Sequence, residues 1–497
     1  MRSDPVAVLR RAFGYPGFRP GQEELVRAVL SGRDALGVLP TGGGKSVCYQ
    51  VPALILDGLT LVVTPLISLM EDQVGRAREV GLRAECLSAT RPAAVRRTVI
   101  ERAGAGALDL LFVSPERLET SVFRALLARC RIVLLAVDEA HCISEWGHDF
   151  RPAYRTIAAA TRRLQAPTLA LTASATPEVR ADVRRSLRMS DPLEVVLSFD
   201  RSNLWWAVER AGPPRDRLRR IRALVRGSGC AIVYAPTRRA VEQLRDDLAR
   251  HAIPCDAYHA GLPGPERSRV QQRFMDGTTR VVAATNAFGM GIDKPDVRTV
   301  VHLQLPGTLE AYYQEAGRAG RDGLPSRCIA LHGRGDRRLA DRFLDRTHPR
   351  KRRLRAVHRA LRRASDPEGV ADVTDPRVVR ALGEVPRGWM EGEPQGALAA
   401  LERAGALRPV PYPGTERRSG GSFRRARLLP GRLDPARVEA RRGVVAAKID
   451  AVQRYARTRG CRSRALLRYF GEMRRDACGR CDRCGWDTER GLPDPDG

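Results

Sequence analysis

Short apolar runs alternate with longer stretches of helical periodicity over the first two thirds of the chain. In the first part the runs are "ALGVLP", "LTLVVTP", "LDLLFVSP", "RIVLLAVDEA" and "PTLALTAS". In the second part they are "GCAIVYAPT", "PCDAYHA", "TRVVAATN", "RTVVHLQLP" and "SRCIALH". Each run ends in a polar or Gly/Pro turn, and such alternation is typical of parallel strands covered by helices on both faces. The pattern predicts an α/β protein with two doubly wound parallel-sheet lobes that divide near Ser198.

The pattern changes from about Arg346. The run "RTHPRKRRLRAVHRALRR" predicts a basic helix, and either a solvated helix face or contact with phosphates explains its charge. Residues 366–445 are rich in Pro, Gly and Arg, and contain the amphipathic pattern "GALAALERAGALR" followed by "SFRRARLL". This region predicts either a small winged-helix-like unit or a linker with one helix.

These patterns give a domain order. We expect lobe 1 at 1–198, lobe 2 at 199–345, a basic linker with a possible winged-helix-like unit at 346–445, a cysteine-containing subdomain at 446–487 and a disordered tail at 488–497.

Charge narrows the class of partner. The 497 residues include 86 Lys and Arg against 57 Asp and Glu, a net charge of +29. An excess of this size favours a polyanionic partner, and nucleic acid leads that class. No leader pattern opens the sequence and no apolar run approaches the ~20 residues of a membrane span, so we expect a soluble cytoplasmic protein without a membrane partner.

The segment "LPTGGGKS" predicts a phosphate-binding loop. It follows a strand run and precedes the helical stretch "VCYQVPALIL", which is the context that a phosphate needs at a helix N-terminus. Lys45 is one of only four lysines in an Arg-rich chain, so chance is a poor explanation for it. Ser46 would ligate Mg²⁺. At the end of another buried run, "AVDEAH" places Asp138 to hold Mg²⁺ through water and Glu139 to activate the attacking water.

The eleven cysteines fall into two groups. Seven are scattered among apolar stretches and are expected to be core thiols. The other four have the spacing C-x₁₆-C-x₂-C-x₂-C in polar surroundings, which predicts a closed, structural Zn²⁺ site, one per chain, formed by Cys461, Cys478, Cys481 and Cys484.

Together these motifs resemble a known family. "PTGGGKS", "DEAH" and "QEAGRAGRDG" are similar to the motifs of superfamily 2 helicases, in which Leu39 is no departure from the usual loop. "DEAHCISEWGHDFRPAY", "FGYPGFRPGQEELV" and the C-terminal "YARTRGCRSRALLRYFGE" narrow the resemblance to the RecQ family of DNA helicases. The resemblance runs from about residue 10 to 335 and resumes at 451–485.

The resemblance implies roles for individual residues. Those that would bind ATP are Arg19, Gln22, Thr41, Gly42, Gly43, Gly44, Lys45 and Ser46. Those that would act in hydrolysis are Lys45, Asp138, Glu139, His141, Gln314, Arg318 and Arg321, with Arg321 the first choice for the arginine that reaches the γ-phosphate and Arg318 the second. Those that would contact DNA are Thr64, Pro65, Ser68, Arg117, Trp146, His148, Phe150, Arg151, Thr285 and Asn286. The stretch "ALTASATP" matches the motif that couples hydrolysis to lobe movement, with Ser174 where relatives often have Thr.

The implied function is ATP- and Mg²⁺-dependent 3′→5′ unwinding of DNA in repair and recombination. Expected partners are single-stranded, tailed and branched DNA, together with single-strand-binding and other repair proteins, for a monomer at the bacterial nucleoid. In longer family members a winged helix and an HRDC domain follow the zinc module, whereas residue 497 here lies soon after Cys484. We therefore expect a short form whose winged helix, if present, lies upstream. The alternative is a DNA-stimulated ATPase that acts as a duplex translocase or an annealing or clamp protein without separating strands.

Overall fold

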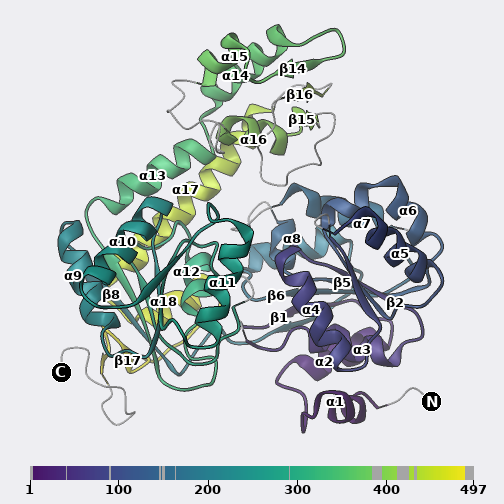
Figure 1. Ribbon diagram of the computed structural model, residues 1–497, viewed down its shortest axis with the longest axis horizontal. Coiled ribbons are helices and arrows are strands. Elements are labelled where there is room, and N and C mark those ends of the chain that lie inside the picture. Colours follow the sequence, from purple (N-terminus) through teal and green to yellow (C-terminus); the bar gives the residue numbers. More distant parts are fainter. Residues whose placement is uncertain are drawn as a thin grey trace. The chain divides into compact units, whose positions relative to one another are not determined.

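The structure is a computed structural model that describes residues 4–40, 42–65, 67–88, 91–144, 147, 151–162, 164–289, 292–382, 395–410, 425–429 and 434–486. The chain forms two compact units (Figure 1): unit 1 comprises Met1–Gly333 with Tyr455–Gly497, and unit 2 comprises Arg334–Arg454. None of the described helices combines the length and apolar character that a membrane span requires.

Lobe 1 of unit 1 is built on a seven-stranded sheet in the order β3-β4-β2-β5-β6-β1-β7, with every pair parallel. Its strands are β1 (Ala35–Val38), β2 (Leu59–Val63), β3 (Ala84–Leu87), β4 (Leu110–Val113), β5 (Ile132–Val137), β6 (Thr168–Thr172) and β7 (Leu193–Val196). Its α-helices are α1 (Pro5–Phe13), α2 (Gln22–Leu30), α3 (Val47–Ile55), α4 (Ile67–Glu79), α5 (Ala93–Gly104), α6 (Ser121–Leu127), α7 (Ile157–Ala160) and α8 (Pro177–Leu187). Short 3₁₀ turns are η1 (Pro115–Glu119), η2 (Ala140–Ile143) and η3 (Pro152–Thr156).

Lobe 2 repeats the architecture. Its parallel strands are β8 (Leu204–Arg210), β9 (Cys230–Tyr234), β10 (Cys255–Tyr258), β11 (Val281–Ala284), β12 (Val297–His302) and β13 (Ser326–His332). Its helices are α9 (Pro214–Val225), α10 (Arg238–Arg250), α11 (Gly264–Met275) and α12 (Leu309–Ala316). The predicted pair of doubly wound parallel-sheet lobes is therefore confirmed, and all ten strands predicted from apolar runs are present.

The apolar pattern failed to predict β3, and the reason can be identified. β3 carries Glu85, which is 7% exposed and interrupts the apolar run. Three arginines neutralise the Glu85 carboxylate: Arg78 of α4 at 2.6 Å, Arg91 of the loop before α5 at 2.9 Å and Arg102 of α5 at 2.8 Å. A buried carboxylate with this many charge-assisted bonds is tolerated at a position where the pattern alone argues against a strand.

The C-terminal hairpin extends the sheet of lobe 2. β17 (Arg480–Cys481) pairs with β18 (Gly485–Trp486) and joins edge strand β8, with Cys481 opposite Trp206. Backbone bonds continue the attachment, since Asp482 N donates to Trp206 O at 3.0 Å and Val208 N donates to the Asp482 carboxylate at 3.2 Å. The cysteine module therefore packs on lobe 2 as part of its sheet.

A buried ion pair holds this module together. Arg462 opens α18 (Arg462–Tyr469) and is fully buried; its Nε and Nη2 donate to the two oxygens of Asp482 at 2.8 and 3.0 Å. Its Nη1 donates to the Tyr455 carbonyl. Such a bidentate pair fixes geometry as well as charge.

The same module contacts the segment that connects the lobes. Glu472 accepts bonds from the Ser198 hydroxyl at 2.6 Å and from Phe199 N at 2.9 Å. The Phe199 ring stacks on Phe470 with centroids 4.3 Å apart, and Tyr313 OH donates to the Phe199 carbonyl at 2.9 Å. The connection between the lobes is thus held by the cysteine module and by α12 of lobe 2.

Unit 2 has its own core. Its elements are α13 (Asp336–Thr347), α14 (Lys351–Ala364), β14 (Val370–Asp372), α15 (Pro376–Leu382), α16 (Gln395–Arg403), β15 (Leu407–Val410) and β16 (Arg425–Leu428), and α17 (Pro435–Arg457) continues from it into the cysteine module. The three strands form an antiparallel sheet in the order β14-β16-β15 and share one hydrophobic cluster with α14, α15 and α16.

Two expectations for this region need correction. A linker with one helix is wrong, because several helices and a sheet share a core here. The basic run from Arg346 is also not a single helix: α13 ends at Thr347 and α14 begins at Lys351. Pro349 lies in this break, where its ring and missing N–H disfavour a continuous helix.

The Arg462–Asp482 pair generates a stability prediction. Replacing Arg462 with Leu leaves the Asp482 carboxylate without its buried cation, and we expect the free energy of unfolding to fall by about 3 kcal/mol. Urea unfolding followed by tryptophan fluorescence will measure it, because Trp206 lies at the attachment strand. Arg483 is the matched control, since it approaches the same carboxylate at 3.9 Å from a more exposed position. We expect Arg483→Leu to change stability by less than about 0.5 kcal/mol, and equal effects of the two variants would contradict the prediction.

Candidate functional site

The loop between β1 and α3 has the backbone of a phosphate-binding turn. Gly42 and Gly44 have φ of 81° and 68°, in the left-handed region that favours glycine. At Gly43 an added Cβ would lie 2.8 Å from the Pro40 carbonyl. Lys45 and Ser46 follow at the N-terminal end of α3, where unpaired N–H groups and the helix dipole favour an anion. Thr41 lies outside the described residues.

The two residues expected to recognise adenine contact this loop. Gln22 is 3% exposed, and its amide nitrogen donates to the carbonyls of Gly43 at 2.9 Å and Gly44 at 3.0 Å. Its amide oxygen accepts from Arg19 N at 2.9 Å, while Arg19 Nη1 donates to the Gly42 carbonyl at 2.5 Å. The pair therefore stabilises the turn itself, and any change at Gln22 is transmitted directly to the loop.

The two predicted acids lie at the end of β5. Glu139 has φ 47° and ψ 46°, a left-handed conformation that costs a non-glycine residue of order 1 kcal/mol or more. This turn directs its carboxylate toward the loop, where Glu139 Oε1 lies 3.7 Å from Lys45 Nζ. Asp138 accepts a bond from Glu139 N at 2.9 Å. Burial and the neighbouring charge of Glu139 together raise the pKa of Asp138 to about 6, against the opposing effect of Lys45.

A chain of polar contacts leads from Glu139 across to lobe 2. His141 Nδ1 lies 3.4 Å from Glu139 Oε2 and 2.9 Å from Thr172 Oγ1, which is consistent with a proton on Nδ1. Thr172 Oγ1 bonds to both the carbonyl and the N–H of Ser174 at 3.3 and 3.4 Å. Gln314 on α12 then donates to the Ser174 hydroxyl at 3.0 Å. The Ser174 hydroxyl is thus the point at which this chain of contacts reaches Gln314.

The two candidate arginines of lobe 2 differ in their surroundings. Arg318 is buried, and its Nη1 donates to the Gly289 carbonyl, where an added Cβ on the glycine would lie 2.3 Å from Arg318 Nη2. Arg321 lies beside the phosphate loop, because a Cβ added to Gly42 would be 3.8 Å from its Cγ and Cδ. Burial lowers the pKa of Arg321, as does the charge of Arg318, while Asp293 stabilises the cation at 2.5 Å.

Some residues of this site escaped sequence reasoning. Asp293 bridges Arg321 and Arg76, whose Nη1 lies 3.6 Å from Asp293 Oδ2, so it joins the two lobes. Thr172 links His141 to Ser174. Both lie inside stretches whose pattern was recognised, and a lone acid beside one of the four lysines was the available signal for Asp293.

The residues expected to contact DNA differ in burial, and the structure describes only some of them. Thr64 and Pro65 follow β2 and are buried; the Pro65 carbonyl accepts from Arg151 Nη1 at 3.1 Å. Arg117 lies in η1 and is half-buried, Thr285 follows β11, and Asn286 is exposed. Trp146, His148 and Phe150 lie outside the described residues, and so does the side chain of Ser68. The loop after Glu139 is anchored by Tyr154, whose OH donates to the Asp138 carbonyl at 3.0 Å.

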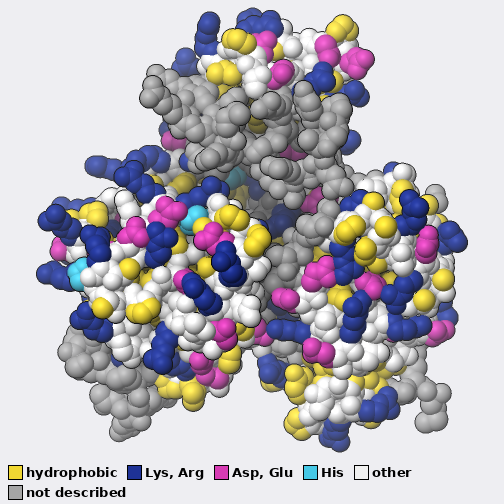
Figure 2. Space-filling view, in the orientation of Figure 1, with side chains coloured by type: hydrophobic (Ala, Val, Ile, Leu, Met, Phe, Trp, Pro, Cys, Tyr) yellow, Lys and Arg dark blue, Asp and Glu magenta, His cyan; other side chains and the backbone are white. Residues whose placement is uncertain are grey.

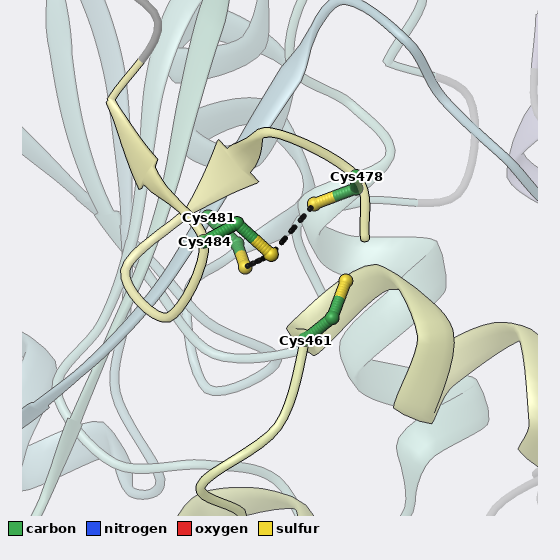
Figure 3. A group of neighbouring side chains, drawn as sticks. All are labelled: Cys461, Cys478, Cys481 and Cys484. Atoms are coloured by element: carbon green, nitrogen blue, oxygen red, sulfur yellow. Dashed lines mark hydrogen bonds between the residues drawn. The ribbon is translucent and has the colours of Figure 1, made fainter. Parts of the chain in front are cut away.

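The four predicted zinc ligands converge (Figure 3). Cys461 precedes α18 and the other three come from the β17–β18 hairpin, with all four sulfur atoms within 4.8 Å of one another. Cys484 lies 3.4 Å from Cys481 and 3.9 Å from Cys478. A tetrahedral zinc with Zn–S bonds of about 2.3 Å separates its sulfurs by about 3.8 Å, so the cluster fits this ion.

Backbone N–H groups add support for thiolates. Arg462 N faces Cys481, Arg464 N faces Cys461 and Arg480 N faces Cys478, each at 3.4 Å. A hydrogen bond from the Cys481 thiol lowers the pKa of Cys478 to about 4 against the effect of burial. The cluster with its N–H donors supports the predicted structural Zn²⁺.

The zinc site predicts metal content. Purified protein should contain one zinc per chain by mass spectrometry, and Cys481→Ser should lower both that content and the thermal unfolding temperature, since a structural zinc stabilises the fold that holds it. Cys130→Ser is the control, because Cys130 lies outside the cluster and donates only to the Ala103 carbonyl. A metal-free preparation of equal stability would contradict the assignment.

The raised pKa of Asp138 predicts a pH-dependent Mg²⁺ affinity. A ligand must be ionised to bind, so lowering the pH from 7.5 to 5.5 should weaken Mg²⁺ binding by protein loaded with an ATP analogue about fourfold through this group. Between about pH 4 and 6 the Asp138 carboxyl keeps its proton in the folded state but has lost it in the unfolded chain. The contribution of Asp138 to the stability of the fold therefore falls as the pH rises through that window. Calorimetric Mg²⁺ titrations at the two pH values, corrected for the nucleotide alone, will measure the effect. Asp138→Asn should remove it, and an unchanged pH dependence in that variant would contradict the role.

Comparisons with known proteins match three parts of the chain. The chain matches the DEAD/DEAH box helicase family over residues 19–183, the helicase conserved C-terminal domain over 216–323 and the RecQ zinc-binding family over 426–485. Two solved structures share the fold at low identity. These are S. cerevisiae Dbp5 bound to RNA and ADP BeF3 (TM-score 0.53, 16% identity, 69% of this chain and 90% of that one) and the DUF1998 helicase MrfA bound to DNA (TM-score 0.57, 17% identity, 88% and 64%).

Relatives in sequence are closer. "ATP-dependent DNA helicase RecQ" of Haemophilus influenzae is 43% identical over 332 residues, which are 67% of this chain and 54% of that protein. The chain thus spans about half the length of this relative. "Probable ATP-dependent DNA helicase RecS" of Bacillus subtilis is 35% identical over 486 residues, which cover 96% of this chain and 91% of that protein. On this similarity along almost its whole length, and on the converging helicase and zinc motifs, the chain belongs to the RecQ family of helicases.

Proposed function

We propose that this protein is an ATP-dependent DNA helicase that moves 3′→5′ along a single strand and separates duplexes in DNA repair and recombination. The observation that carries the proposal is the polar chain from Lys45 and Glu139 through His141, Thr172 and Ser174 to Gln314. It joins a nucleotide-type loop on one lobe to a helix of the other, so a change of charge at the loop has a direct route to the contact between lobes.

Each side chain then has a defined task. Lys45 and Ser46 would hold the phosphates and Mg²⁺ at the start of α3, and Asp138 would hold the ion through water. Mg²⁺ supplies neutralisation of charge on the transferring phosphoryl group. Glu139 would orient and deprotonate the attacking water, and Lys45 Nζ lies 3.7 Å from this carboxylate. His141 Nδ1 lies 3.4 Å from Glu139 Oε2 and would help to orient this carboxylate.

Arg321 is the residue we assign to the γ-phosphate. Its Nη1 is held by Asp293, whereas its buried Nε has no hydrogen-bond partner in the described part of the chain. A buried, unpaired guanidinium donor beside Gly42 suits an anion bound in the loop. Because Arg321 belongs to lobe 2, its contribution requires the lobes to be closed, and an arginine of this kind can be worth ~10³ or more in rate. Arg318 also has a buried Nε without a hydrogen-bond partner in the described residues, but its Nη1 is engaged with the Gly289 carbonyl, so the position beside Gly42 is what favours Arg321.

The relay supports coupling between hydrolysis and movement. Gln314 donates a hydrogen bond to the Ser174 hydroxyl across the contact between the lobes, which opening would break and closure would remake. The strand would advance between the DNA-contact residues of the two lobes in each cycle. The proposal extends to single-stranded and tailed DNA as partners of a monomeric protein, and the net charge of +29 favours these polyanions.

The decisive experiment is strand release from a 3′-tailed duplex in a single turnover, compared with a 5′-tailed duplex. The wild-type protein should release the strand only with ATP, Mg²⁺ and a 3′ tail. Glu139→Gln should lower ATP hydrolysis by about 100-fold or more while retaining ATP-dependent DNA binding, and Lys45→Ala should abolish unwinding. Glu79→Gln removes an exposed acid from α4 and should behave as wild type.

Two outcomes would contradict the proposal. DNA-stimulated hydrolysis without strand release would favour the translocase, annealing or clamp alternative. Normal hydrolysis in Glu139→Gln would remove this residue from the mechanism.

A further inference from the structure

Helix α14 of unit 2 carries a strongly basic face that nothing in the ATP or zinc sites uses. Its 14 residues include one Lys and six Arg and no acid. Leu354, Val357, Ala360 and Leu361 are buried in the core of unit 2. On the opposite face, Arg352, Arg355, Arg359 and Arg362 are exposed at spacings of three and four, which aligns them in one stripe about 15 Å long.

These cations are not neutralised within the protein. In the described part of the chain, no acid pairs with the four arginines of the stripe. The two acids that follow the helix pair elsewhere, Asp366 with Arg425 at 3.7 Å and Glu368 with Arg427 at 3.8 Å. In Figure 2, Lys and Arg side chains project from the surface over α14 and α15.

The arrangement opposes the stability of the helix. Arg355 and Arg359 are like charges four residues apart, and so are Arg359 and Arg363, each a destabilising pair. The first turn carries Lys351, Arg352 and Arg353 at the positive end of the helix dipole, where cations are unfavourable. Arg353 donates to the Leu382 carbonyl, but no acid pairs with the arginines of the stripe in the described residues. A local rule broken this consistently is expected at functional surfaces.

We propose that the exposed face of α14 binds the phosphate backbone of duplex DNA. A duplex presents one negative charge about every 1.7 Å along its axis, so a rigid 15 Å stripe of cations is matched along its whole length. Proteins that hold single strands also supply aromatic platforms for unstacked bases. α14 has no Phe, Tyr or Trp, which suits a ligand whose bases are stacked inside and whose phosphates alone are exposed.

The other helices of unit 2 are less suited to binding DNA. The elements from α14 to β16 follow the order helix–strand–helix–helix–strand–strand, as in winged-helix units, whose third helix commonly enters a groove. Here the third helix, α16, lies against α13: a Cβ added to Gly396 would be 1.5 Å from the Arg346 carbonyl. Its Ala397, Leu398, Ala400 and Leu401 are buried in the core of the unit. The basic first helix is therefore the face that unit 2 offers to DNA.

This inference rests on the proposed function, and it supplies a duplex contact upstream of the zinc module. It is tested in the full-length protein by fluorescence anisotropy on a blunt duplex and on oligo(dT). The triple variant Arg355→Ala/Arg359→Ala/Arg362→Ala should lower duplex affinity at least about tenfold. It should also reduce the slope of log K against log salt by about 2.7, or 0.9 for each lost phosphate contact. Oligo(dT) binding and oligo(dT)-stimulated ATP hydrolysis should remain at the wild-type level.

Two matched variants complete the design. Arg219→Ala/Arg245→Ala/Arg250→Ala removes the same charge from lobe 2, where each arginine pairs with an acid, and should leave duplex binding unchanged. Arg355→Lys/Arg359→Lys/Arg362→Lys keeps the charge and should retain most of the affinity. Thermal unfolding of the alanine triple should be no lower than wild type, since like charges have been removed.

Several results would overturn the inference. They are unchanged duplex affinity in the alanine triple, equal loss on duplex and oligo(dT), or a loss confined to anionic vesicles, which would assign the face to a lipid surface. If the wild-type protein hydrolyses ATP in response to oligo(dT), these results reject only the role of α14. If it does not respond to DNA at all, the proposed function itself fails.

Discussion

The charge balance at the end of β5 is the constraint on which the ATP site depends. Asp138 and Glu139 are adjacent carboxylates, and burial opposes ionisation of the first. Lys45 is the cation that lies against Glu139 of this pair, and it follows a loop that Gly42 and Gly44 turn through left-handed backbone conformations. Glu139 in turn accepts a left-handed backbone to face Lys45, and His141 secures it from the other side. The strain is offset by the ion pair and by Tyr154, which bonds to the carbonyl of Asp138.

A second constraint is the attachment of the C-terminal cysteine module to the segment that connects the two lobes. The zinc-type cluster orders a short hairpin, the hairpin joins β8, and Glu472 and Phe470 hold the connecting segment at Ser198 and Phe199. Tyr313 contacts the same segment, and its neighbour Gln314 makes the bond to Ser174. The cysteine cluster is therefore placed to affect the lobe contact through a short series of packed residues, although it supplies no group to the phosphate loop.

Sequence reasoning succeeded where chemistry is local and failed where it depends on distant partners. Apolar runs located the central strands because both faces are buried. They missed β3, whose Glu85 needs arginines from elsewhere, and also β7 and β8. β8 lies between β13 and the zinc hairpin. Lys45, Asp138, Glu139 and the four cysteines stood out by residue type and spacing. Asp293, Thr172 and Arg462 did not, because their importance arises from contacts across the fold that no local pattern encodes.

The same distinction applies to the basic segment near residue 350. In sequence, a solvated helix face and a phosphate-binding face look alike, because both are rows of exposed cations. The structure separates them by what surrounds the charges. On lobe 2 the exposed arginines Arg219, Arg245 and Arg250 each lie within ion-pair distance of an acid, so these three charges are neutralised locally. On α14 the neighbouring acids are committed to β16, and the like charges stay together at a cost to the helix. An external polyanion is the simplest source of the missing counter-charge.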